Sequence, residues 1–155
     1  MSRKTDRKFA AHVAQLRADF GVEATICDRY QNDLMHQLLL ERFFQSVKRA
    51  TSKWIHRGYR WHAYSFGYAS ALHGPAAFDA YVAQRIEPFY ILFELDDLML
   101  NCTATQWPDL RPLESDIYVF PHRMHWLFVT THEMSIDLGP YFAKPDNGEQ
   151  RPADS

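Results

Sequence analysis

The chain has 155 residues, which is the size of one domain and enough to bury roughly two thirds of its unfolded surface. Hydrophobic residues make up 46% of the sequence, charged residues 23% and aromatic residues 15%, and this composition excludes a disordered or fibrous chain. No apolar run reaches the roughly 18 residues of a membrane-spanning helix, and the amino terminus leads into no apolar signal segment. We therefore expect a single cytoplasmic domain spanning residues 1–155.

Charge is distributed unevenly along the chain. Residues 1–60 carry a net charge of +6 and residues 61–155 a net charge of −8, which together give the overall −2. The two halves could neutralise each other by packing together. Alternatively, the densest acidic stretch is a surface that attracts a basic protein partner, because charge of one sign steers oppositely charged partners. The predicted partner-binding residues are its six carboxylates and one aromatic anchor: Glu94, Asp96, Asp97, Trp107, Asp109, Glu114 and Asp116.

Three segments have helical patterns. Apolar residues recur at helical spacing over residues 5–20. A wider apolar stripe follows Asp28, a suitable N-cap residue, and extends to about Arg49. Pro75 suits the first turn of a shorter third helix, which Pro88 would prevent from continuing.

Four segments have the patterns of β-strands. Aromatic residues at 60–66 predict a strand, and residues 89–95 are apolar on both faces, which predicts a strand near the centre of a sheet. Residues 116–120 and 124–131 are extended runs on either side of a three-residue connection, so they predict a β-hairpin. Residues 139–142 could add a short edge segment.

This order of elements predicts an α+β fold. We expect an antiparallel or mixed sheet of about four to five strands, covered by helices on one face, with a helical amino-terminal part. Residues 144–155 are polar and contain proline, so we expect them to form a flexible tail.

The end of the second hairpin strand carries the best candidates for chemistry. His132 lies there beside Glu133, so it could be a general base oriented by a carboxylate. If the segment with Trp61 and His62 is its neighbour, these residues and Tyr141 would line the pocket of a small hydrolase. No GxSxG, HExxH, P-loop or GxGxxG motif supplies a nucleophile or a phosphate site. The alternative interpretation is a structural histidine, hydrogen-bonded to backbone where a strand meets a loop.

We expect neither a metal nor another cofactor. On a strand, His125 and His132 would lie about 23 Å apart and point to opposite faces, too far for one zinc site. The basic aromatic stretch from Lys48 to Trp61 has the residue types of a nucleic-acid surface. However, the net charge of −2 favours a protein partner over nucleic acid, and we expect no membrane partner.

Five segments of the chain resemble a small bacterial family of unknown function. They are WHAYS (61–65), YILF (90–93), DIYV (116–119), WLFVTTHE (126–133) and GPYF (139–142). The resemblance covers about residues 54–142 and implies an α+β fold without assigned catalytic residues. Proteins of this kind are loosely similar to immunity proteins of bacterial toxin systems. Together with the acidic stretch, this likeness favours a non-catalytic protein that neutralises a basic toxin domain. The residues around His132 and Glu133 leave a small hydrolase as the alternative.

Overall fold

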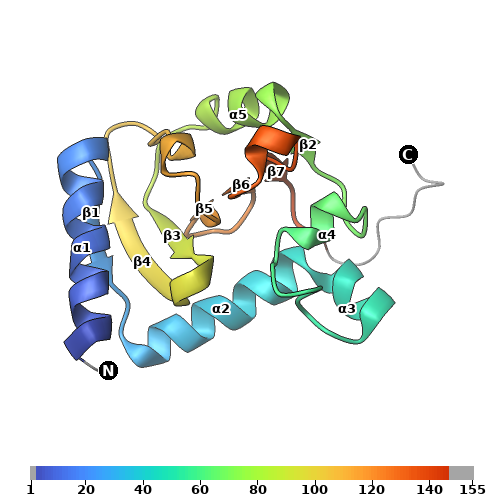
Figure 1. The fold of residues 1–155 in the computed structure, drawn as a ribbon, viewed down its shortest axis with the longest axis horizontal. Coiled ribbons are helices and arrows are strands. Elements are labelled where there is room, and N and C mark those ends of the chain that lie inside the picture. Colours follow the sequence, from blue (N-terminus) through green and yellow to red (C-terminus); the bar gives the residue numbers. More distant parts are fainter. Residues whose placement is uncertain (1–2, 147–155) are drawn as a thin grey trace.

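A seven-stranded sheet runs through the molecule in the order β1-β4-β3-β5-β6-β7-β2, and every neighbouring pair is antiparallel (Figure 1). This computed structural model describes residues 3–146. The α+β class is confirmed, but the sheet is larger than the four to five strands expected from the sequence. The strands are β1 (Glu23–Ile26), β2 (Leu72–His73), β3 (Phe89–Phe93), β4 (Leu98–Thr103), β5 (Ile117–Pro121), β6 (Leu127–Thr130) and β7 (Tyr141–Ala143).

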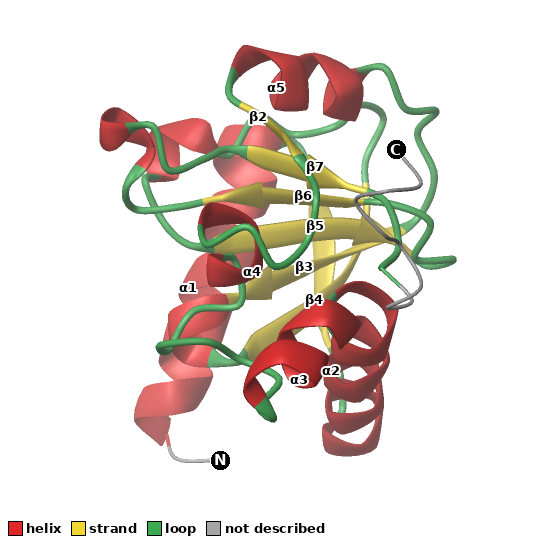
Figure 2. Cartoon of the chain, turned by 90° about the vertical axis from the view of Figure 1, so that its right-hand side faces the viewer, coloured by secondary structure: helices red, strands yellow, loops and turns green. Residues whose placement is uncertain are grey.

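Helices cover both faces of the sheet, and Figure 2 shows the strands between α1 and the pair α2 and α3. The prediction of helices on one face only is therefore wrong. Alternate residues of β3 explain why: Phe89 and Ile91 point into one hydrophobic core, Tyr90 and Leu92 into the other, and both need cover. The helices are α1 (Arg3–Phe20) and α5 (Pro75–Val82) on one face, and α2 (Arg29–Phe43), α3 (Gln45–Thr51) and α4 (His62–Ser65) on the other.

The helix predicted after Asp28 forms and then breaks. The Asp28 carboxylate caps α2 by accepting a hydrogen bond from the backbone N–H of Gln31 at 2.7 Å. Phe44 ends α2 with a non-helical backbone, and α3 begins at the next residue. The helix predicted to begin at Pro75 is α5, which is confirmed.

The predicted buried strand and hairpin form, but the predicted three-residue connection is wrong, because residues 122–126 separate the two hairpin strands, and the predicted edge position is wrong as well. β3 lies between β4 and β5, and β5 and β6 form the hairpin with Val119 opposite Phe128. β7 is not an edge strand, because β2 pairs with it on its outer side. Among residues 3–146, no helix has the length and apolar character needed to cross a bilayer.

Asp146 anchors the chain where the sequence predicts a flexible tail. This residue is buried, its backbone N–H donates to the carbonyl of Arg42, and its carboxylate accepts from the backbone N–H of Ser46 at 3.0 Å. The rest of the predicted tail, residues 147–155, lies outside the described residues.

Asp96 ties α1 to the end of β3. Its carboxylate pairs with Lys8 and with His12, and the His12 ring stacks on Phe93 with 4.1 Å between the centroids. Burial alone would raise the pKa of Asp96, but the hydrogen bonds from Lys8 and His12 outweigh it and hold this pKa below its usual value. Asp96 therefore helps to hold α1 against the end of β3.

We expect acid to weaken this attachment. A carboxyl group whose pKa is lowered by folding contributes stability above its unfolded pKa of about 4, and this contribution disappears as the pH falls through the lower, folded value. Asp96→Asn should therefore cost stability at neutral pH and flatten the loss of stability between about pH 5 and pH 2. Urea unfolding of the native protein and Asp96→Asn across this pH range tests the prediction. Asp137→Asn, a substitution at an exposed position, is the control. An unchanged pH dependence in Asp96→Asn would contradict the assignment.

Candidate functional site

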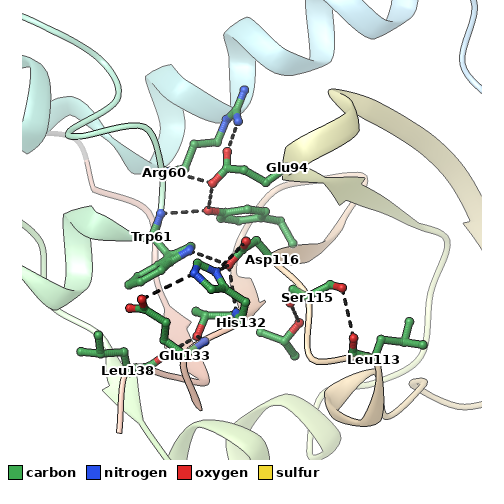
Figure 3. A network of polar contacts seen from close by, with 12 residues as sticks. Arg60, Trp61, Glu94, Leu113, Ser115, Asp116, His132, Glu133 and Leu138 are labelled. Atoms are coloured by element: carbon green, nitrogen blue, oxygen red, sulfur yellow. Dashed lines mark hydrogen bonds and ion pairs between the residues drawn. The ribbon is translucent and has the colours of Figure 1, made fainter. Parts of the chain in front are cut away.

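Asp116 is a buried carboxylate on which hydrogen bonds from two segments converge (Figure 3). Its side chain, just before β5, is only 1% exposed. Its Oδ1 accepts from the indole Nε1–H of Trp61 at 2.8 Å, the backbone N–H of His132 at 3.0 Å and the ring Nδ1–H of His132 at 2.9 Å. The indole and backbone N–H groups can only donate and a carboxylate oxygen accepts, so this geometry assigns the ring proton of His132 to Nδ1.

This carboxylate fixes the protonation pattern of the His132 ring. Nδ1 carries the proton that Asp116 accepts, so Nε2 holds the lone pair when the ring is neutral. The His132 side chain is 39% exposed, and Nε2 lies 3.5 Å from Oε1 of Glu133. A buried carboxylate behind an accessible imidazole is the arrangement that orients a general base.

A second buried carboxylate, Glu94, fixes the segment that carries Trp61. Glu94 pairs with the Arg60 guanidinium and accepts from the backbone N–H of Arg60 at 2.8 Å and from the Tyr118 hydroxyl at 2.6 Å. That hydroxyl in turn accepts from the backbone N–H of Trp61 at 2.8 Å (Figure 3). Burial and the charge of Glu94 raise the pKa of Tyr118 well above its usual value, which keeps the phenol protonated.

These hydrogen bonds explain why the strand predicted at residues 60–66 is wrong. The backbone N–H groups of Arg60 and Trp61 donate to side chains of the sheet, so they are not available for pairing with a neighbouring strand. The chain then turns into the single helical turn α4.

His62 is a second imidazole with one nitrogen held. Its Nδ1 lies 2.7 Å from the carbonyl oxygen of His56, which can only accept, so Nε2 is the basic nitrogen here too. The His62 ring lies 5.4 Å from Tyr59 and 4.5 Å from Trp61, and the His132 ring lies 5.1 Å and 6.0 Å from the same two rings. Two oriented imidazoles therefore contact one aromatic pair.

The loop after β6 is held beneath His132 by Thr131. The Thr131 hydroxyl donates to the carbonyl of Leu138 and accepts from the backbone N–H of Glu133 at 3.1 Å. Gly139 has a φ of 113°, and a Cβ at this position would lie 3.0 Å from the Thr131 methyl group. Both its backbone conformation and this close approach therefore favour glycine.

The structure brings together four of the five residues predicted for a pocket. Trp61, His62, His132 and Glu133 form one cluster, built on Asp116. The fifth, Tyr141, is buried in β7 and packs against the ring of Tyr64 at 5.6 Å. Burial, followed by the charge of Glu133, raises the pKa of Tyr141.

The expectation of one exposed acidic surface is wrong. Glu94, Asp116 and Trp107 are buried. The two buried carboxylates accept hydrogen bonds from inside the molecule, and the Trp107 indole donates to the carbonyl of Gln84 at 2.7 Å. A carboxylate next to a buried strand satisfies donors of neighbouring segments, and the sequence cannot distinguish it from one that faces solvent.

The other four acidic residues differ in their surroundings. Asp96 contacts α1, and Asp109 forms a bidentate pair with Arg111 at 2.8 Å. Glu114 is exposed, and the side chain of Asp97 is 75% exposed at 3.5 Å from the Arg60 guanidinium. Only part of the predicted stretch therefore faces solvent.

Metal-ligating side chains are not grouped within the described range, residues 3–146, since no three or more His, Cys, Asp or Glu residues are placed to hold an ion. His122, at the far end of the hairpin, contacts Asn101 at 2.7 Å. A groove of about 610 Å³ lies between α1 and β1, but alanines dominate its lining and Arg17 is its one titratable residue. The chemistry is therefore concentrated at Asp116 and not at this groove.

A family profile matches much of the chain. The profile of DUF4275, a domain of unknown function, matches residues 28–142. The match includes Asp116, both imidazoles and all five segments of the resemblance, and it begins after α1 and β1. Neither the curated proteins nor the solved structures contain a significant match.

Proposed function

Because the chain belongs to the DUF4275 family, a domain of unknown function, we propose its function from the site itself: a small hydrolase-like enzyme in which His132 is the general base. One observation carries this proposal. The carboxylate of Asp116, 1% exposed, accepts the Nδ1 proton of an imidazole that is 39% exposed. The buried carboxylate holds the ring and stabilises the imidazolium that forms when Nε2 takes up a proton.

Proton transfer then involves three groups. Nε2 of His132 removes a proton from a bound hydroxyl or water, a step that typically contributes 10²–10⁴-fold to a rate. Glu133, 3.5 Å from Nε2 and partly exposed, can pass this proton to solvent. His62, held through its own Nδ1, is the candidate general acid for the leaving group.

The nucleophile comes from outside the protein. Within residues 3–146, no hydroxyl or thiol forms a hydrogen bond with the ring of either His62 or His132. The nearby hydroxyls donate elsewhere: Thr130 to the carbonyl of Ser115, and Thr131 to that of Leu138 (Figure 3). We therefore assign the role of nucleophile to water or a substrate hydroxyl.

A chromogenic ester and a chromogenic phosphodiester, p-nitrophenyl acetate and bis-p-nitrophenyl phosphate, test this proposal. We expect His132→Gln to lower the turnover of at least one of them by about 10²-fold or more, with little change in melting temperature. His122→Gln, at the other end of the hairpin, is the matched control. Equal turnover by the native protein and His132→Gln, or none by either, would rule out activation of water by His132 on these two substrate classes.

Partner binding is a second candidate, and the turn after β3 favours it. Leu95 is 77% exposed at this turn, next to the exposed carboxylate of Asp97. An apolar tip beside a negative charge suits a basic protein, such as the toxin domain that an immunity protein would neutralise. We expect the product of an adjacent gene to bind the chain and Asp97→Lys to slow its association. Biolayer interferometry measures both, and binding by no such product would exclude this candidate.

A further inference from the structure

We propose that the substrate at His132 is single-stranded RNA, whose ribose 2′-hydroxyl supplies the nucleophile that the protein lacks. This inference rests on the proposed acid–base function of His132 and names the substrate class of that site. Three features support it: a series of partly exposed rings, exposed cations beside these rings, and two oriented imidazoles.

A series of aromatic contacts leads away from His132. Tyr59 lies 5.1 Å from His132 and 5.4 Å from His62. Phe66 lies 5.1 Å from His62 and 4.8 Å from His56. The Phe66 ring is 49% exposed, and the other rings of the series are partly exposed. Unpaired bases stack on such rings whatever their sequence, whereas bases inside a duplex cannot reach them.

One exposed cation contacts this aromatic series, and two others precede it closely in the sequence. The Arg57 guanidinium lies 5.4 Å from the ring centroid of Phe66. Lys48 on α3 and Lys53 in the following loop are also exposed, and Lys48 lies 5.7 Å from the Trp54 ring. The whole chain has a net charge of −2, but residues 45–60 contain five Lys or Arg residues and no Asp or Glu, and phosphates respond to the local charge. Cations interleaved with rings are suited to a chain of phosphates and bases.

The two imidazoles can perform a balanced transfer on this substrate. Nε2 of His132 takes the 2′-hydroxyl proton, and the 2′-oxygen forms a bond to the adjacent phosphorus. The bond from phosphorus to the 5′-oxygen breaks, and that oxygen receives a proton from the His62 imidazolium. The products are a 2′,3′-cyclic phosphate and a 5′-hydroxyl end, and the net proton balance is zero. DNA cannot react in this way, because it has no 2′-hydroxyl.

The first experiment compares three fluorescent single strands of one sequence, about 20 nucleotides long: RNA, DNA and 2′-O-methyl RNA. We expect the native protein to cleave only the RNA and to leave 2′,3′-cyclic phosphate ends, identified by mass spectrometry. His132→Gln and His62→Gln should each lower the rate by about 10²-fold or more, and His122→Gln should leave it unchanged. The comparison between substrates does not depend on whether a variant folds.

The second experiment measures binding of the uncleaved 2′-O-methyl strand. Removing two phosphate contacts with the double variant Lys53→Gln/Arg57→Gln should lower the slope of log affinity against log salt by about 1.4. The control is Arg123→Gln, because this exposed cation lies in the turn at the far end of the hairpin. An unchanged slope in the double variant would overturn the assignment of Lys53 and Arg57 as phosphate contacts.

Cleavage of DNA as fast as RNA, or equal RNA cleavage by His132→Gln, would overturn the RNA proposal. If the chromogenic phosphodiester still reacts in a His132-dependent manner while RNA is untouched, the RNA proposal fails and the hydrolase-like function stands. If His132 contributes to the turnover of none of these substrates, both fail.

Discussion

Asp116→Asn should lower the His132-dependent rate by about 10³–10⁴-fold, the scale of loss when the carboxylate behind a catalytic histidine becomes an amide. The amide carbonyl can still accept from Trp61 Nε1 and from the backbone N–H of His132, whose present distances are 2.8 and 3.0 Å. The amide nitrogen would then donate to Nδ1 and force the His132 proton onto Nε2. The base would be lost although the ring stays in place. Steady-state kcat/KM on the reactive substrate measures this effect.

Asp116→Ala should in addition destabilise the fold. It removes the acceptor of three donors, of which the indole N–H of Trp61 is buried and the two of His132 are partly buried, and an unsatisfied buried group costs about 1–3 kcal/mol. We expect a total loss of about 3–5 kcal/mol in the free energy of unfolding, partly relieved by local rearrangement. Asp137→Asn, at an exposed position, is the control in both experiments. Native-like kcat/KM in Asp116→Asn would contradict the assigned role of the carboxylate.

Glu94→Gln should cost about 3–5 kcal/mol, because it leaves the Arg60 guanidinium charged and buried without its counter-ion. The two side chains are 4% and 8% exposed, so water cannot replace the lost partner. Asp97, 3.5 Å from the same guanidinium but 75% exposed, should matter little, and Asp97→Asn should change stability by less than about 1 kcal/mol. Urea unfolding at neutral pH provides these values.

The double variant Arg60→Met/Glu94→Leu removes the two charges and keeps buried side chains of similar size at both positions. Apolar side chains of similar size can replace a buried ion pair with little loss, but Glu94→Leu also removes the acceptor of the Arg60 backbone N–H and of the Tyr118 hydroxyl. The double variant should therefore recover only part of what Glu94→Gln loses. Activity should remain low in Glu94→Gln and in the double variant, because Glu94 also fixes the backbone before Trp61 and His62. A loss below about 1 kcal/mol in Glu94→Gln would mean that Asp97 can replace Glu94.

Parts of the fold were predictable because single residues determine them. Asp28 identifies the start of α2 through its side-chain cap, and residues 89–93 are apolar at every position, which suits a strand covered on both faces. β2 has only two residues and gives no usable pattern. β1 and β4 are neighbouring strands that lie far apart in the sequence, and their pairing cannot be derived from either short segment alone.

The site was predictable only in part. His132 and Glu133 stand out beside an apolar strand, whereas the role of Asp116 depends on the register of the hairpin. A three-residue connection would place Asp116 opposite Phe128. In the observed register Ile117 pairs with Thr130, which moves Asp116 along the partner strand to His132. The wider turn that sets this register includes Met124 with a positive φ of 51°, which its sequence does not predict.

Long-range ¹H–¹⁵N correlation spectra of the imidazoles measure most directly whether Asp116 makes Nε2 the basic nitrogen of His132. In the native protein, with the ring neutral, we predict a protonated Nδ1 and an unprotonated Nε2, and we predict the reverse in Asp116→Asn. His122, hydrogen-bonded to Asn101 through Nε2, is the internal reference and should not change between the two proteins. A native His132 ring protonated on Nε2, or the same pattern in both proteins, would contradict the proposed role of Asp116 and with it the proposed base.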